Sequence, residues 1–236
     1  GGELRLHASL LDLDYFDSHR AQFPLTQLLA ALQQSKLVRY SDIDHGVMEA
    51  DLATLPEIPD ASTYVLELRP DVHWGDGEPT NGRLLSTDDL RANLDRQVAG
   101  LDALGAVDPS LERQSLFQRT ASVEVFDNTT IIFRSDGPDA TYLGGVLAGP
   151  WSFLQAPETW ELYGDLLRDD PLRSAYYSGT GPFRIGSFRP DWGIDLVPNP
   201  AYFRQGRPYL DRIVLLDLPT SAGQEQAFRD GELDLW

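Results

Sequence analysis

The sequence has four histidines, a residue type that can bind metal ions or transfer protons, but their spacing does not indicate a common site. They are His7, His19, His45 and His73. No two of them stand four residues apart, the spacing that places two metal ligands on one face of a helix. We therefore expect surface or turn roles for the histidines and no metal site.

Three aspartates at alternating or nearby positions, Asp12, Asp14 and Asp17, are similar to the start of a calcium-binding loop. That motif also needs a glycine in its middle and a carboxylate at its twelfth position, and the sequence has neither at those places. The pattern therefore favours a solvated acidic loop.

The glycines of Gly179-Thr180-Gly181, with Gly186 further on, are a partial match to a dinucleotide-binding loop. Pro182 follows at once and the next segment has a strand pattern, whereas that loop must open a helix. The glycines therefore indicate a turn. The sequence also lacks Gly-x-Ser-x-Gly, His-Glu-x-x-His and a Walker loop, so its motifs predict neither an enzyme nor a cofactor.

The composition of the chain excludes some classes of binding partner and some structural features. The chain has 236 residues, of which 42% are hydrophobic, and a net charge of -18 from 37 acidic and 19 basic residues. Such a charge repels the phosphates of nucleic acid, which we exclude as a partner. Without cysteine there are no disulfides or thiolate ligands. No apolar run approaches the ~20 residues of a membrane span, and the first residues lack a signal-peptide pattern, so we expect any targeting segment to be absent from this sequence.

In the first half of the chain, apolar periodicity predicts a strand at 3–8 and a helix that begins at Pro24. The predicted apolar stripe of that helix comprises Leu25, Leu28, Leu29 and Leu32. A second strand is expected at 63–69. Ser86 precedes acidic residues and a leucine repeat, the pattern of a helix N-terminus.

The second half alternates strands and helices. We predict a hairpin of 122–126 with 130–134, a helix at 157–167, strands near 183–185, 194–197 and 211–218, a helix at 221–229 and a closing strand at 232–235. The order after residue 181 is therefore β-β-β-α-β, which indicates a mixed α/β class.

Several segments, in this order, resemble a known family. They are 1–6, 64–77 with 87–90, 179–183, the run Asn199-Pro200 to Val214, and Gly231-Glu232-Leu233-Asp234-Leu235. Together they are similar to the family 5 extracellular solute-binding proteins of ABC importers, which include the oligopeptide- and dipeptide-binding proteins.

The resemblance implies a periplasmic-binding-protein-like type II lobe with an inserted α+β subdomain. It assigns 1–36 and 151–236 to a discontinuous, incomplete first lobe and 37–150 to the inserted region. Family members are about twice as long and continue through a hinge into a further lobe, which we expect to be absent from this chain. An exposed sheet edge would follow.

The resemblance also implies a place for the ligand. In the family the loop after the first strand offers its backbone to an extended ligand, and here that loop holds His19, Arg20, Ala21, Gln22 and Phe23. A plain connection is the alternative. Further candidate ligand contacts are Tyr176, Tyr177 and Trp236, whose rings offer large contact areas beside a turn and at the hinge end.

The implied function is the extracytoplasmic component of an ABC importer, which binds a small peptide or other small solute between two lobes and delivers it to the membrane permease. Relatives also take nickel chelates, sugars or opines. We expect a monomer at full length and a lipid anchor upstream of Gly1. The alternative is a ligand-sensing module of the same fold, coupled to a regulator or receptor. No motif in the sequence indicates a hydrolase.

Overall fold

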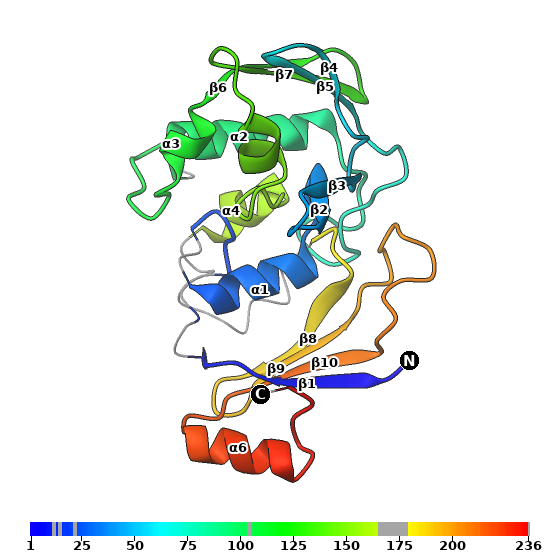
Figure 1. Ribbon diagram of the computed structural model, residues 1–236, viewed down its shortest axis with the longest axis vertical. Helices are drawn as coiled ribbons and strands as arrows, with labels where there is room; N and C mark the ends of the chain where they lie inside the picture. Colours follow the sequence, from blue (N-terminus) through cyan, green and yellow to red (C-terminus); the bar gives the residue numbers. More distant parts are fainter. Residues whose placement is uncertain (11–12, 14–15, 21–22, 103–104, 165–178, 236) are drawn as a thin grey trace.

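The structure is a computed structural model that describes residues 1–10, 13, 16–20, 23–102, 105–164 and 179–235. Its elements form two layered regions, one at each end of the long axis of the molecule (Figure 1). The first and last parts of the chain build one region, and the middle of the chain builds the other.

Four strands of the first region form a mixed sheet. They are β1 (Glu3–His7), β8 (Phe183–Arg189), β9 (Gly193–Pro198) and β10 (Arg212–Leu216). Their order is β1-β10-β9-β8, with β1 and β10 parallel and the other neighbours antiparallel. The predicted strands at 3–8, 183–185, 194–197 and 211–218 are therefore confirmed.

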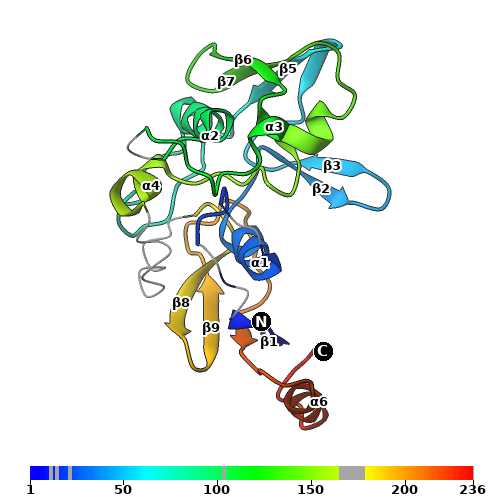
Figure 2. The same cartoon turned by 90° about the vertical axis from the view of Figure 1, so that its left-hand side faces the viewer.

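Two helices cover the mixed sheet. Figures 1 and 2 both place α1 (Pro24–Gln33) between this sheet and the second region, and α6 (Ser221–Arg229) on the opposite side. Leu25 and Leu29 of α1 join the core under the helix together with Ile185, Ile194 and other residues of the sheet.

The predicted stripe of α1 is wrong at Leu28, which is 38% exposed. The buried side of the helix runs through Thr26, Ala30 and Gln33 instead. The turn at 179–181 lies against the C-terminal end of the helix, where Gly181 N donates a 2.9 Å hydrogen bond to Gln33 O.

The second region is centred on an antiparallel sheet. Its strands are β4 (Glu57–Asp60), β5 (Thr63–Glu67), β6 (Thr120–Val125) and β7 (Thr130–Ser135), in the order β4-β5-β7-β6. The predicted β6–β7 hairpin is confirmed. In its turn the Asp127 carboxylate accepts the main-chain N–H groups of Thr129 and Thr130 at 2.9 and 2.7 Å.

Helices and a small hairpin complete this region. They are α2 (Thr87–Ala99), α3 (Gln114–Phe117), the π-helical turn η2 (Leu143–Leu147), α4 (Pro157–Tyr163), and the hairpin of β2 (Val38–Asp42) with β3 (Val47–Ala50). The predicted start of α2 is confirmed, since Ser86 and Asp89 form a reciprocal capping box. The predicted helix 157–167 is described only to α4, and its end lies outside the described residues.

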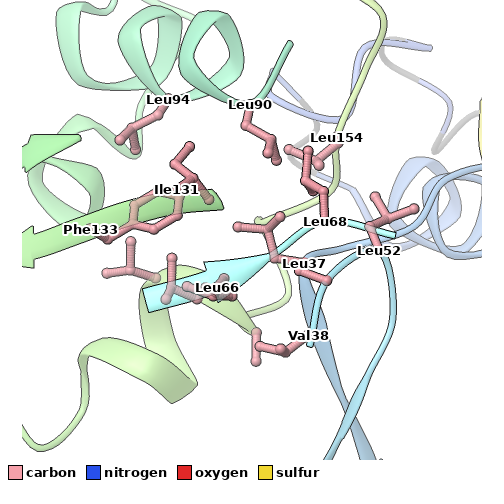
Figure 3. Close-up of a cluster of buried hydrophobic side chains, with 14 of the residues drawn as sticks. Leu37, Val38, Leu52, Leu66, Leu68, Leu90, Leu94, Ile131, Phe133 and Leu154 are labelled. Carbon is pink, nitrogen blue, oxygen red and sulfur yellow. The ribbon is translucent and has the colours of Figure 1, made fainter. Parts of the chain in front are cut away.

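A large apolar core fills the second region. Figure 3 shows Leu66 of β5 and Ile131 of β7 facing Leu90 and Leu94 of α2. Fully buried Trp74 joins the same core and donates its indole N–H to Asp89 Oδ2 at 3.2 Å. The core of the mixed sheet is a separate cluster.

The predicted closing strand at 232–235 is wrong. It pairs with β1 at one position only, Leu6 with Leu235. The reason lies one residue earlier, because the Asp234 carboxylate accepts the Arg5 main-chain N–H at 2.7 Å. A strand would have used a backbone carbonyl for that donor.

Candidate functional site

The segment that leads into the predicted ligand loop is buried. Asp17, Ser18, His19 and Arg20 are each less than 5% exposed. The segment lies where the two regions meet, beside residues 152–156 and the buried side of α2. The prediction of a solvated acidic loop is therefore wrong at Asp17. Asp12 and Asp14 lie outside the described residues.

Asp17 is held by a two-pronged ion pair with Arg96 of α2. Arg96 Nη1 donates to Asp17 Oδ1 at 3.1 Å, and Nη2 donates to Oδ2 at 2.6 Å. Gln155 Nε2 adds a 2.6 Å hydrogen bond to Oδ1, and the His19 main-chain N–H adds one at 3.0 Å. A buried carboxylate with this many donors is a rigid anchor, because each of its oxygens has a fixed partner.

The protonation of Asp17 follows from these contacts. Burial by itself raises the pKa of the Asp17 carboxyl, but the positive charge and hydrogen bonds of Arg96 and the Gln155 amide more than offset it, and the pKa lies well below its usual range. Asp17 is therefore ionised at neutral pH.

The His19 ring is hydrogen-bonded to the same Arg96 guanidinium. Its Nδ1 is 3.0 Å from Arg96 Nη1, and its Nε2 is 3.1 Å from the carbonyl oxygen of Phe153. Burial, and then the positive charge of Arg96, lower the pKa of His19 to about 4. The neutral ring consequently accepts at Nδ1 and donates at Nε2. Of the surface or turn roles expected of the histidines, a surface position is wrong for His19, which is buried but lies in the turn closed by Arg20 N and Asp17 O.

Two further contacts tie this segment to the second region. Arg20 makes a 2.5 Å ion pair with Asp108, in the loop after α2. Burial alone raises the pKa of Asp108, but hydrogen bonds from Ser110 and the Arg20 charge lower it overall. The Trp160 ring of α4 covers the Arg96 guanidinium at 4.8 Å and the His19 ring at 5.7 Å. We call Asp17, His19, Arg20, Arg96 and Gln155 the anchor cluster.

The predicted ligand-binding residues fall into three groups. His19 and Arg20 are buried and bonded to protein groups, whereas Phe23, the N-cap residue of α1, is 45% exposed. The remaining candidates, Ala21, Gln22, Tyr176, Tyr177 and Trp236, lie outside the described residues. Ligand binding by any of these residues stays a prediction.

The motif analysis missed the partners Arg96, Asn93 and Gln155. Asn93 exchanges two hydrogen bonds with the Gln155 main chain, at 2.8 and 2.9 Å, and so joins α2 to the segment beside the anchor. A signal for these residues exists in α2, where Asp89, Asn93 and Arg96 recur at helical spacing and are all buried. A polar stripe beside an apolar one indicates a buried polar contact.

Within the described part of the chain, no three His, Cys, Asp or Glu residues are grouped closely enough to hold a metal ion. Nor does any helix among those residues have the length and apolar character needed to cross a membrane. The anchor cluster consists of ion pairs and hydrogen bonds between residues of this chain. What it offers chemically is a fixed starting point for the loop that continues to Phe23.

The arrangement of layers is that of known solute-binding proteins. The chain superposes on the A. tumefaciens R10 protein MoaA, in complex with mannopinic acid, with a TM-score of 0.78 at 24% identity, covering 99% of this chain and 44% of that one. For Helicobacter pylori DppA in complex with the peptide STSA, the TM-score is 0.76 at 23% identity, with 99% and 46% coverage. The fold is therefore the mixed α/β fold of the type II periplasmic binding proteins, as expected.

Sequence comparison gives the family. The chain belongs to the bacterial extracellular solute-binding proteins, family 5, whose "Middle" model matches residues 48–236. The glutathione-binding protein GsiB of Salmonella typhi is 28% identical over 154 residues, which are 65% of this chain and 26% of that protein. A putative ABC transporter peptide-binding protein of Brucella ovis is 28% identical over 203 residues, 84% of this chain and 34% of the relative. The chain thus spans about a quarter to a third of these relatives.

Proposed function

We propose that this chain is part of the extracytoplasmic solute-binding component of an ABC importer, and that the whole protein binds a peptide or peptide-like solute and hands it to a membrane permease. The observation that carries the proposal is the family match over residues 48–236. Relatives described as glutathione- and peptide-binding support the class of solute. The protein acts by binding and release, without catalysis.

The proposed division of the chain assigns 1–36 and 151–236 to a first lobe and 37–150 to an inserted region. Two separate apolar cores support a division into two parts, one around the mixed sheet and one around the antiparallel sheet, although Leu154 and Ala156 of the proposed first lobe pack in the second core. In this proposal the family's further lobe, which is joined through a hinge, lies outside these 236 residues. The solute binds between the first lobe and that further lobe.

The proposed contact with the solute is the loop 19–23. The side chains of His19 and Arg20 are engaged by Arg96, Phe153 and Asp108, so the proposal assigns solute contact to the main chain of the loop and to the exposed Phe23 ring. Main-chain contact holds an extended peptide without reading its side chains. Tyr176, Tyr177 and Trp236 remain proposed contacts on the same grounds of resemblance.

The proposed setting is outside the cytoplasm, in line with a family of extracellular proteins. A lipid anchor on a segment upstream of Gly1 and a monomeric full-length protein complete the proposal. The net charge of -18 supports a partner other than nucleic acid.

The function is tested by calorimetric titration of the whole protein with unmodified di-, tri- and tetrapeptides. We expect at least one length to bind, and Phe23→Ala to weaken binding. Leu28→Ala is the matched control, since Leu28 is an apolar residue of the neighbouring helix with similar exposure. Absence of binding by all the peptides would contradict the peptide class. Equal affinities of the two variants would contradict the role of Phe23.

A further inference from the structure

A pocket of about 340 Å³ opens between the end of α1, the β2–β3 hairpin and the loop after β9. Residues that line it include Gln34, Lys36, Tyr40, Ile43, Phe153 and Tyr202. His19, Arg20 and Phe23 do not line it. The described residues of the proposed solute-contacting loop therefore lie behind the pocket wall, where His19 is bonded to the carbonyl oxygen of Phe153.

Lys36, the one lysine of the sequence, provides a cation in this pocket. Its ammonium lies 4.2 Å from the centre of the Phe153 ring. Burial lowers the pKa of Lys36 to about 8, against the opposing effect of the Asp51 charge. Among the described residues no carboxylate forms an ion pair with this ammonium. Asp51 acts on this half-buried cation from beyond ion-pair distance and compensates only part of its lost hydration.

The nearby carboxylates are already engaged. Asp51 accepts the Lys36 main-chain N–H at 3.0 Å and an Arg204 N–H at 2.9 Å. Glu49 accepts Arg39 Nε at 2.6 Å. Hence the one carboxylate among the described lining residues, Asp51, is bound to other donors, and so is Glu49 nearby.

A second hydrogen-bond donor without a partner in the described part of the chain, the side-chain amide of Gln34, lies beside Lys36. Gln34 is 3% exposed, and its Oε1 accepts a 2.7 Å hydrogen bond from Ser18. Its amide nitrogen is buried and has no hydrogen-bond partner among the described residues. Buried donors are rarely left without an acceptor. This nitrogen is buried behind the pocket surface, so Lys36 is the donor that the pocket offers, and much of the wall around it is aromatic or aliphatic.

We propose that this pocket is a second binding site, for a small carboxylate with an aromatic or aliphatic body. The carboxylate accepts from Lys36 Nζ, and the body packs on Phe153, Tyr40 and Tyr202. The volume is near the lower end of the range for small-molecule pockets, which limits the ligand to a few more atoms than one aromatic ring. This inference does not rest on the proposed transport function.

Calorimetric titration of the whole protein with 3-phenylpropionate tests the site. The Lys36→Met variant removes the charge and keeps an unbranched stem, and Arg91→Met removes an exposed cation of α2 as the matched control. We expect the wild type and Arg91→Met to bind alike, and Lys36→Met to bind at least about tenfold more weakly, the usual effect of losing a charged hydrogen bond. The neutral amide of the same acid should lose a similar factor. Equal binding by Lys36→Met, or no binding by the wild type, would overturn the proposal.

A measurement on the wild type alone guards against a variant that fails to fold. A bound carboxylate raises the pKa of Lys36, so at pH 8 binding should take up about half a proton from the buffer. Titrations in two buffers with different heats of ionisation measure this uptake. Binding without proton uptake would place the carboxylate elsewhere and would equally overturn the proposal.

Discussion

Asp17 and Arg96, which are 79 positions apart in the sequence, form a buried ion pair with N–O distances of 2.6 and 3.1 Å. The pair joins the segment before the predicted ligand loop to the long helix of the other region. Its strength decides how firmly that loop is placed.

Removal of one partner of this pair should destabilise the protein strongly. Arg96→Met leaves the Asp17 carboxylate buried without its cation, a change that typically costs about 3–5 kcal/mol. Arg91→Met is the control on the same helix, because Arg91 pairs with Asp95 in solvent, where such a pair contributes under about 0.5 kcal/mol. Urea denaturation measures both. Similar losses in the two variants would show that the buried pair is no anchor.

The pKa of His19 predicts a pH dependence of stability. The folded-state pKa is about 4, below the ordinary value of 6.5, so the unfolded chain binds a proton between these pH values while the folded chain does not. Stability is complete above about pH 6.5 and should fall by about 3 kcal/mol as the pH approaches 4. His19→Gln should flatten this part of the profile. Urea midpoints measured from pH 7 to 4 check it, with His45→Gln as the variant of an exposed histidine. An unchanged slope in His19→Gln would contradict the assignment.

The turn at 179–181 should not tolerate a side chain. A Cβ at Gly181 would overlap the backbone of Gln33 and Gln34, where the turn meets the end of α1. Gly181→Ala should therefore destabilise by roughly 1–3 kcal/mol or more, the usual effect of forcing atoms into a packed site. Gly77→Ala is the control, since a Cβ there has nothing within 4 Å. Thermal melts of both variants test the contact, and an equally stable Gly181→Ala would refute it.

The capping box of α2 should contribute a smaller, separable amount. Ser86 Oγ accepts the Asp89 main-chain N–H, and the Asp89 carboxylate accepts the Ser86 main-chain N–H at 2.9 Å. Ser86→Ala should lower the free energy of unfolding by about 1 kcal/mol, while Ser86→Thr keeps the acceptor and most of that stability. If chemical denaturation ranks the two variants equally, the hydroxyl of Ser86 does not cap the helix.

Local patterns predicted most of the fold. The alternation at β1, the proline at the start of α1, the cap of α2 and the β6–β7 turn are set by neighbouring residues, and each is found where the pattern places it. The exposure of Leu28 was not predictable in this way. It depends on which side of the helix the rest of the chain covers, and here the buried side includes Thr26, Ala30 and Gln33.

The anchor cluster shows a different limit. Charge alone predicts a solvated position for Asp17, and only its distant partner Arg96 makes burial favourable. The polar spacing of Asn93 and Arg96 on α2 was a usable sign that a buried partner exists, but it does not say which residue is the partner. The predicted loop 19–23 came from a family resemblance, which assigns a position along the chain and not the contacts of its side chains.

The most direct test of the proposed function is native mass spectrometry of the whole protein as purified from its own cells. A solute-binding component that holds its peptide between closed lobes should retain a series of bound masses that match short peptides and disappear after partial unfolding and refolding. A single non-peptide adduct, or a bare protein that also fails to take up added peptides, would contradict the peptide-binding account.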